Sequence, residues 1–150
     1  MTVWVVSGAC RGVGKTWLAQ RLSQILPQAV CAKIGHNPRK QGRAGDYFTS
    51  VGGFLGFLES LRGCRHCVVE SNRLALRGYG DVVVFIDAPR DARGVRKDAP
   101  TLRARAGIVI ERNPQVVVWR RVVGPAVGDP STADAVCALF QQQVRFISRA

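Results

Sequence analysis

Short apolar runs rich in β-branched residues recur along the chain, and a polar or glycine-containing segment follows each of them. Runs of this kind are typical of buried β-strands. The first is the clearest, because residues 2–7 are β-branched or aromatic up to the closing Ser7. The pattern predicts six strands, over 2–7, 29–34, 66–70, 81–87, 107–110 and 116–119.

Between these runs, apolar residues return every three or four positions, which is the spacing of a helix with one buried face. Asp46 is the predicted N-cap of the second helix, and Asp129-Pro130-Ser131 is the predicted start of the last one. The predicted helices cover 15–26, 46–61, 101–106 and 132–147, with one further helical turn within 74–80.

Strands that alternate with helices predict an α/β fold of three layers, in which a mostly parallel central sheet carries helices on both faces. A length of 150 residues predicts a single domain over 1–150. In sheets of this type, ligands bind beyond the carboxyl ends of the strands. We therefore expect functional residues in the polar segments that follow the strands.

The segment after the first strand, Ala9–Thr16, matches the Walker A pattern G-x-x-x-x-G-K-[ST] except that Ala9 replaces the first glycine. Such a loop binds phosphates through backbone N–H groups, while Lys15 supplies charge and the hydroxyl of Thr16 binds magnesium. The structural alternative is a glycine turn with a solvated lysine. The predicted nucleotide-binding residues are Cys10, Arg11, Gly12, Val13, Gly14, Lys15, Thr16 and Trp17.

A second chemical signal is the acid at the end of the strand 66–70, where Glu70 is followed by Ser71 and Asn72. This is the form of a Walker B element, whose acid holds Mg²⁺ or orients the attacking water. We expect Thr16 and Glu70 to hold the metal, and Lys15 and Glu70 to be the catalytic residues. The alternative is a surface glutamate at a strand end.

Polar residues that follow two other strands are candidates for a second ligand, namely Lys33, His36 and Asp87. The basic segment 39–45 comes next and either closes over a bound anion or is simply solvated. Residues 90–100 form a second charged loop, to which the sequence assigns no role.

Twenty-two Lys and Arg residues against ten Asp and Glu give a formal charge of +12, which implies an anionic partner. Aromatic residues are not interleaved with the arginines, so nucleic acid is a minor alternative. Five cysteines are an odd number, and the pair Cys64 and Cys67 has no second pair to complete a zinc site. We expect Cys67 to be packed in the core, and a cytoplasmic protein without a membrane span or leader.

Four segments together resemble one known family. Ala9–Thr16, Lys33–His36, Gly45–Tyr47 and Val68–Asn72 are similar to motifs of the small P-loop NTPases related to molybdopterin-guanine dinucleotide biosynthesis protein B. The similarity covers roughly residues 2–90. The resemblance implies binding of GTP with Mg²⁺ and a role in attaching a nucleotide to the molybdenum cofactor, with a protein of that pathway as partner.

The chain departs from this family at three positions. Gly35 interrupts a Lys-His pair, Trp17 replaces a threonine, and Ser71 stands where glycine is usual. The chain also has no N-K-x-D segment to bind guanine, and Asn113 is the nearest candidate for a base contact. The preference for guanine is therefore implied by the resemblance only.

These observations predict Mg²⁺-dependent binding and slow hydrolysis of a nucleoside triphosphate, GTP or ATP. One alternative is a small-molecule kinase, in which Lys33, His36 and residues 39–43 hold an anionic acceptor. Another is an adaptor that binds nucleotide without turnover. The sequence leaves open whether the protein works as a monomer or a homodimer.

Overall fold

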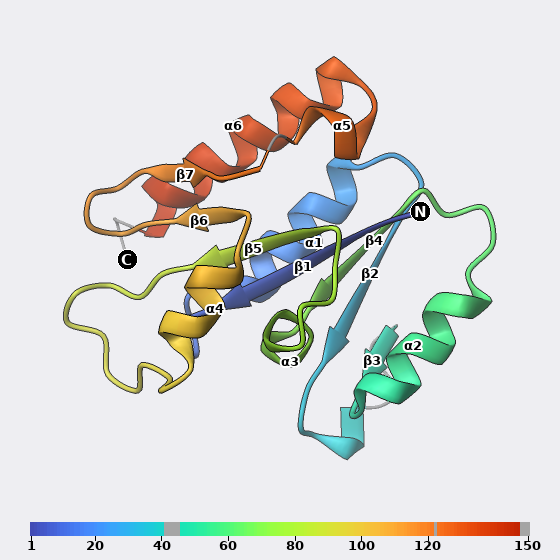
Figure 1. Cartoon of the computed structure of the whole chain (residues 1–150), viewed down its shortest axis with the longest axis horizontal. Helices are drawn as coiled ribbons and strands as arrows, with labels where there is room; N and C mark the ends of the chain where they lie inside the picture. The colour runs from blue at the N-terminus through green and yellow to red at the C-terminus, as the bar shows by residue number, and fades with distance from the viewer. Residues whose placement is uncertain (41–45, 122, 148–150) are drawn as a thin grey trace.

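The computed structural model describes residues 1–40, 46–121 and 123–147, with side chains through Arg145. A seven-stranded sheet runs through this part of the chain, in the order β3-β2-β4-β1-β5-β6-β7 (Figure 1). Neighbouring strands are parallel except β6 and β7, which are antiparallel. The strands are β1 (Thr2–Gly8), β2 (Ala29–Ile34), β3 (Asp46–Phe48), β4 (His66–Glu70), β5 (Val82–Ile86), β6 (Ile108–Ile110) and β7 (Val117–Trp119).

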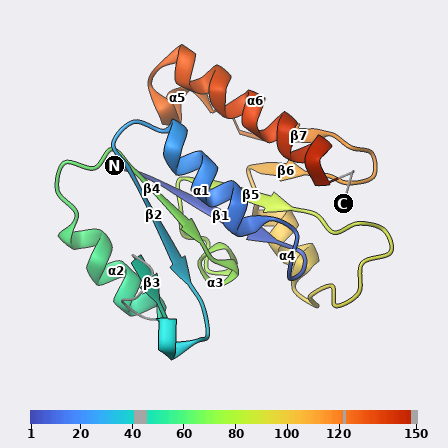
Figure 2. The same ribbon diagram turned by 180° about the vertical axis from the view of Figure 1, so that it is seen from behind.

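Helices cover both faces of the sheet, so the predicted three-layer α/β fold is confirmed (Figures 1 and 2). The helices are α1 (Lys15–Ile25), α2 (Val51–Ser60), α3 (Asn72–Leu76), α4 (Ala99–Arg105), α5 (Gly124–Val127) and α6 (Pro130–Ile147), with a 3₁₀ turn, η1, at Pro38–Lys40. None of the helices in the described ranges is long and apolar enough to cross a membrane.

Alternate residues of the central strands feed two separate cores, as the two-residue period of a strand requires. Trp4 and Val6 pack with α1, α5 and α6, whereas Val5 packs with α2, α3 and α4. Because both faces are buried, these strands are continuously apolar rather than alternating, which is what made them conspicuous in the sequence.

The prediction of one helix over 46–61 was wrong in its first part. Residues 46–48 form the edge strand β3, parallel to β2, and α2 begins only at Val51. The cap is Ser50, whose hydroxyl accepts a hydrogen bond from the N–H of Gly53 at 3.0 Å. A three-residue edge strand is too short to show a period of its own, so it was absorbed into the helix and six strands were predicted instead of seven.

Several other predictions fall on residues outside the described ranges or shift by a few positions. Residues 41–45 of the basic segment and the side chain of Ile147 lie outside the description. The helix predicted over 101–106 begins at Ala99, and the turn predicted within 74–80 begins at Asn72 as α3. The carboxylate of Asp129 accepts from the N–H of Thr132 at 2.9 Å, which caps the start of α6.

The prediction that Cys67 packs in the core is confirmed. Cys67 is fully buried, and burial raises the pKa of its thiol to about 12. All five cysteines are free thiols. A thiol that stays protonated at neutral pH is neither a good nucleophile nor a good metal ligand, so Cys67 acts as a small apolar side chain.

At the amino end of β4, His66 is 2% exposed and accepts a hydrogen bond from the indole N–H of Trp4, 3.3 Å from its Nδ1. The ring is therefore neutral with its proton on Nε2, and Nε2 has no described partner. Burial lowers the pKa of His66, and the neighbouring positive charges of Arg65 and the chain terminus lower it further.

This histidine makes the stability of the protein pH-dependent. Below its ordinary pKa of 6.5, the unfolded chain binds a proton at His66 that the folded protein takes up only at lower pH. The free energy of unfolding should therefore contain the full contribution of His66 above about pH 7 and decrease towards pH 5. This one group can lower it by at most about 1.4 kcal/mol per pH unit. Denaturant unfolding between pH 7 and 5 measures the slope.

His66→Asn is the matched control, because its side-chain oxygen can still accept from Trp4 but cannot take up a proton. Its stability at pH 7 will be lower than that of the wild type, but its slope over the same range should be smaller. If the unfolding free energy of both proteins falls equally steeply between pH 7 and 5, His66 is not the cause of the pH dependence.

Candidate functional site

The site lies at the carboxyl ends of β1, β2 and β4, where the order of the strands reverses. From β1 the chain first builds β2 and β3 on one side, returns to β4 beside β1, and then crosses to β5 on the other side. A crevice forms at such a reversal because the connections that follow the neighbouring strands β1 and β4 run in opposite directions. The segment from Ala9 to Gly14, called here the glycine loop, leaves β1 at this point.

The glycine loop turns directly into α1. Gly12 and Gly14 have positive φ angles of 79° and 96°, which side chains other than glycine rarely adopt. Gly14 is the N-cap of α1 and makes no side-chain cap, so no capping side chain at Gly14 occupies the N–H groups of the first turn. An arrangement of this kind attracts an anion.

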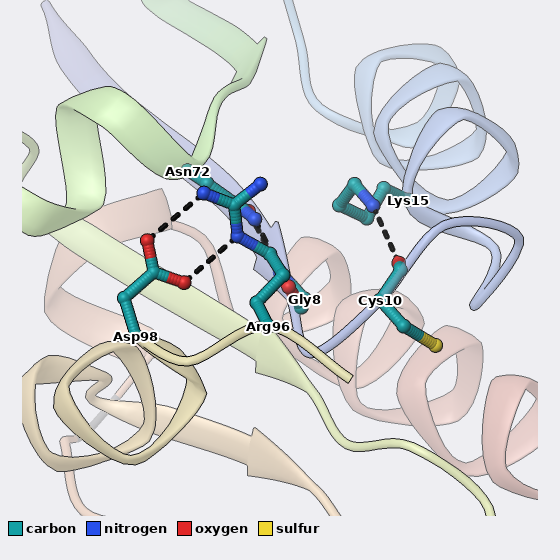
Figure 3. A network of polar contacts seen from close by, with 6 residues as sticks. All are labelled: Gly8, Cys10, Lys15, Asn72, Arg96 and Asp98. Carbon is teal, nitrogen blue, oxygen red and sulfur yellow. Dashed lines mark hydrogen bonds and ion pairs between the residues drawn. The ribbon is translucent and has the colours of Figure 1, made fainter. Parts of the chain in front are cut away.

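A side-chain amide fixes the start of the glycine loop. Asn72 accepts from the N–H of Gly8 and donates to the carbonyl of Gly8, both at 3.0 Å (Figure 3). Gly8 must itself be glycine, because a Cβ there would lie 2.6 Å from a methyl group of Val13. The sequence pattern gave no role to Asn72, and its position two residues after the acid Glu70 was the only signal.

Lys15 lies across the mouth of the loop. Its ammonium donates to the carbonyl of Cys10 at 2.9 Å (Figure 3). Burial lowers the pKa of Lys15, while the nearby carboxylate of Glu70 opposes that effect. A partly desolvated ammonium whose hydrogen bond, among the described residues, is to a carbonyl can exchange that contact for a phosphate oxygen.

Three predicted residues from three elements meet in one cluster. The hydroxyl of Thr16 donates to Oε2 of Glu70 at 2.6 Å, and the ammonium of Lys33 lies 3.0 Å from the same oxygen. Lys33 also donates to the hydroxyl of Thr16 at 3.2 Å. The side chain of Glu70 is only 10% exposed, so its charge is compensated mainly by Lys33. We call these three residues the Thr16–Lys33–Glu70 cluster.

The cluster offers oxygen ligands of the kind that magnesium prefers. Across the described residues, no group of three or more His, Cys, Asp or Glu side chains could hold a metal ion. Mg²⁺, however, commonly takes only one or two protein ligands and completes its shell with phosphate oxygens and water. Thr16 and Glu70 fit that donor set, and the ammonium of Lys33 now lies beside both of them.

On the opposite side of the glycine loop, a buried arginine supports its tip. Arg112 is 6% exposed, and its Nη2 donates to the carbonyl of Val13 at 3.2 Å. Burial lowers the pKa of this guanidinium, and its Nε has no described partner. Asn113, the predicted base contact, follows directly and is exposed. Arg112 was not predicted, because a single arginine after a short strand has no distinguishing pattern.

The structure does not bring Asp87 to the cluster. Its carboxylate pairs with Arg103 of α4 at 2.8 Å, and the same guanidinium contacts Glu111 after β6. Asp87 thus lies at the predicted sheet edge, but its carboxylate forms an ion pair that joins α4 to the ends of β5 and β6. Trp17 lies near the loop with the guanidinium of Arg21 5.8 Å from its ring.

Two hollows that share lining residues adjoin the glycine loop. The smaller, of about 360 Å³, follows the glycine loop and is lined by Arg11, Gly12, Gly14, Lys15, Thr16, Trp17, Lys33 and Glu70. The larger, of about 640 Å³, extends from Lys15 and Lys33 past His36 to the start of α3. Of the three residues predicted to hold a second ligand, Lys33 and His36 line the larger hollow.

No protein-family model matches the chain, and no curated protein is significantly similar to it in sequence.

The contact between Asn72 and Gly8 predicts a stability effect. Asn72→Ala leaves one N–H and one carbonyl of a partly buried strand end without their partner. We expect a loss of about 1–3 kcal/mol in the free energy of unfolding, measured by denaturant titration. Arg77→Ala, on the exposed end of the same helix, is the control and should change stability by less than about 0.5 kcal/mol. Equal losses of stability in the two variants would show that the hydrogen bonds between Asn72 and Gly8 do not stabilise the fold.

Proposed function

We propose that the protein binds a nucleoside triphosphate with Mg²⁺ and hydrolyses it slowly. The observation that carries the proposal is the 2.6 Å hydrogen bond between Thr16 and Glu70, which joins the end of the glycine loop to the end of β4. A turn that merely linked a strand to a helix would have no need of a buried carboxylate on the hydroxyl that follows its lysine.

Each group of the site has a role in this proposal. The N–H groups of residues 12–16 bind the phosphates, and Lys15 moves from the carbonyl of Cys10 to the outer phosphate oxygens. Thr16 and Glu70 hold the magnesium ion, which compensates the charge of the phosphates when it is bound. Glu70 also accepts a hydrogen bond from the water that attacks the terminal phosphate.

The test is calorimetric titration with GTP and ATP in the presence of Mg²⁺, followed by measurement of phosphate release. Lys15→Ala should weaken binding at least about a hundredfold, because it removes the charge that contacts the outer phosphates. The exposed Lys97→Ala removes the same charge from a neighbouring loop and should bind normally. Unchanged affinity of Lys15→Ala, with its fold intact by circular dichroism, would refute the proposal.

Phosphate release separates this proposal from its alternatives. Hydrolysis expects release with water alone, whereas a small-molecule kinase expects turnover only with an acceptor, and an adaptor expects binding without turnover. The kinase is the stronger alternative, because the larger hollow adjoins the position proposed for the terminal phosphate. A cytoplasmic location suits all three, since free thiols are maintained there.

The base and the pathway rest on the resemblance to the molybdopterin-guanine dinucleotide biosynthesis protein B group. On that ground we propose GTP as the nucleotide, with Asn113 beside the base, and a role next to the molybdenum cofactor. Titration with GTP, ATP and a molybdopterin nucleotide compares these ligands directly. Tighter binding of ATP than of GTP would exclude the guanine preference and leave nucleotide binding untouched.

The position of Lys33 predicts how the site binds a metal without nucleotide. Its ammonium occupies the space beside both oxygen ligands, so a divalent cation would meet a like charge there. Lys33→Met should therefore bind Mn²⁺ about tenfold more tightly than the wild type, measured by electron paramagnetic resonance in the absence of nucleotide. Lys40→Met, which removes an exposed charge nearby, is the control. Equal Mn²⁺ affinity of the wild type and Lys33→Met would contradict this role.

A further inference from the structure

The larger hollow extends beyond the glycine loop. It lies on the side of β2 and α3, and its outer wall is formed by residues 34–37, 71–73 and the segment from Gly94 to Arg96. It shares Arg11, Lys15, Lys33 and Glu70 with the smaller hollow. A molecule in the larger hollow would therefore lie next to the groups that we assign to the terminal phosphate.

The lining of this hollow is strongly positive. Glu70 is the only acid among its described lining residues, and Lys33 already pairs with it. A concave surface with one sign of charge concentrates ions of the opposite sign. Its six lysine and arginine residues are Arg11, Lys15, Lys33, Lys40, Arg73 and Arg96.

Arg73 is the fixed cation of the outer wall. Its guanidinium donates to the carbonyl of Gly35 at 2.7 Å and to the carbonyl of Thr49 at 3.0 Å, and it lies 3.4 Å from Nδ1 of His36. Carbonyls orient a guanidinium but do not neutralise it, and no ion pair of Arg73 is found among the described residues. If Arg73 served only to join these two carbonyls, a neutral side chain with N–H donors would be sufficient, and a positive charge would not be needed.

A second arginine approaches from the loop between β5 and α4. The backbone N–H of Arg96 donates to the carbonyl of Ala9 at 2.8 Å, which ties this loop to the glycine loop. Its guanidinium binds both oxygens of Asp98 at 2.8 and 2.9 Å. Figure 3 shows the remaining guanidinium nitrogen on the side away from Asp98. Asp98 orients this 44% exposed guanidinium and compensates part of its charge, and one of the three nitrogens is not bonded to Asp98.

We propose that the larger hollow binds a small molecule that carries a phosphate monoester, with the phosphate on Arg73 and Arg96. Guanidinium groups fit phosphate oxygens in a forked geometry, and fixing them beforehand lowers the entropy lost on binding. The volume is that of a site for a small metabolite. The placement of this molecule beside a terminal phosphate rests on the function proposed above, whereas the anion site itself does not.

The experiment is calorimetric titration with glycerol 3-phosphate at fixed ionic strength. The protein is saturated with Mg²⁺ and a triphosphate whose β–γ bridging oxygen is replaced by nitrogen, so that the glycine loop is filled. We expect one binding site, with glycerol and citrate binding at least tenfold more weakly. If citrate binds more tightly than glycerol 3-phosphate, the ligand belongs to the polycarboxylates, and the proposed class of phosphate monoesters is wrong.

Two pairs of variants locate the site. Arg73→Gln should weaken glycerol 3-phosphate at least tenfold, whereas Arg77→Gln, one turn further along on an exposed position, should change its affinity less than twofold. Arg96→Gln and Arg93→Gln form the second pair and should differ in the same direction, because Arg93 lies in the same loop but does not line the hollow. Thermal unfolding of each variant checks the fold, and Arg96→Gln tests the proposal even if Arg73→Gln does not fold.

A last titration separates this proposal from the proposed function. Without nucleotide, glycerol 3-phosphate should still bind to the Lys15→Ala variant, and adding Arg73→Gln to that variant should weaken the binding. This expectation holds even if the wild type binds no nucleotide. Two results would overturn the inference: binding that is lost in Lys15→Ala but unchanged in Arg73→Gln, or no binding of glycerol 3-phosphate to the wild type at all.

Discussion

The structure depends on the fixed position of β1 in the middle of the sheet. This strand is hydrogen-bonded to β4 on one side and β5 on the other, and its residues from Trp4 to Ser7 are fully buried. Its last residue, Gly8, is held by both ends of the amide of Asn72. The glycine loop therefore starts from a rigid point, and the amides of α1 and the carboxylate of Glu70 are fixed relative to it.

Charge is the second constraint on this edge of the sheet. The Thr16–Lys33–Glu70 cluster compensates the one acid of the larger hollow's described lining with a lysine, and of the surrounding arginines Arg96 is paired with Asp98 whereas Arg73 has no ion pair among the described residues. A net charge of +12 by itself accounts for many solvated cations on the surface of the protein. It does not account for cations that hydrogen bonds orient around a hollow. Arg73 and Arg96 are held in place by hydrogen bonds, which is the property expected of a recognition surface.

Much of the fold could be predicted because the central strands are buried on both faces and therefore uniformly apolar. The amphipathic helices were found for a related reason, since their apolar residues repeat with the helical period. The edge strand β3 was missed because three residues carry no period and its pairing with β2 is made through backbone groups. Ser50, the real N-cap of α2, was passed over in favour of Asp46, which is also a common N-cap residue.

By itself, the sequence determined the order of the strands and helices apart from β3 and α5, the glycine loop with Lys15 and Thr16, and the acid at the end of β4, because each depends on neighbouring residues or on a local period. Only the tertiary structure decided which charges meet. It joined Lys33 to Glu70, turned Asp87 towards Arg103, and brought Asn72, Arg73 and Arg112 to the site. The reason is physical: such contacts join residues that are 16 to 99 positions apart, and the register of the strands and the packing of the helices set their distances.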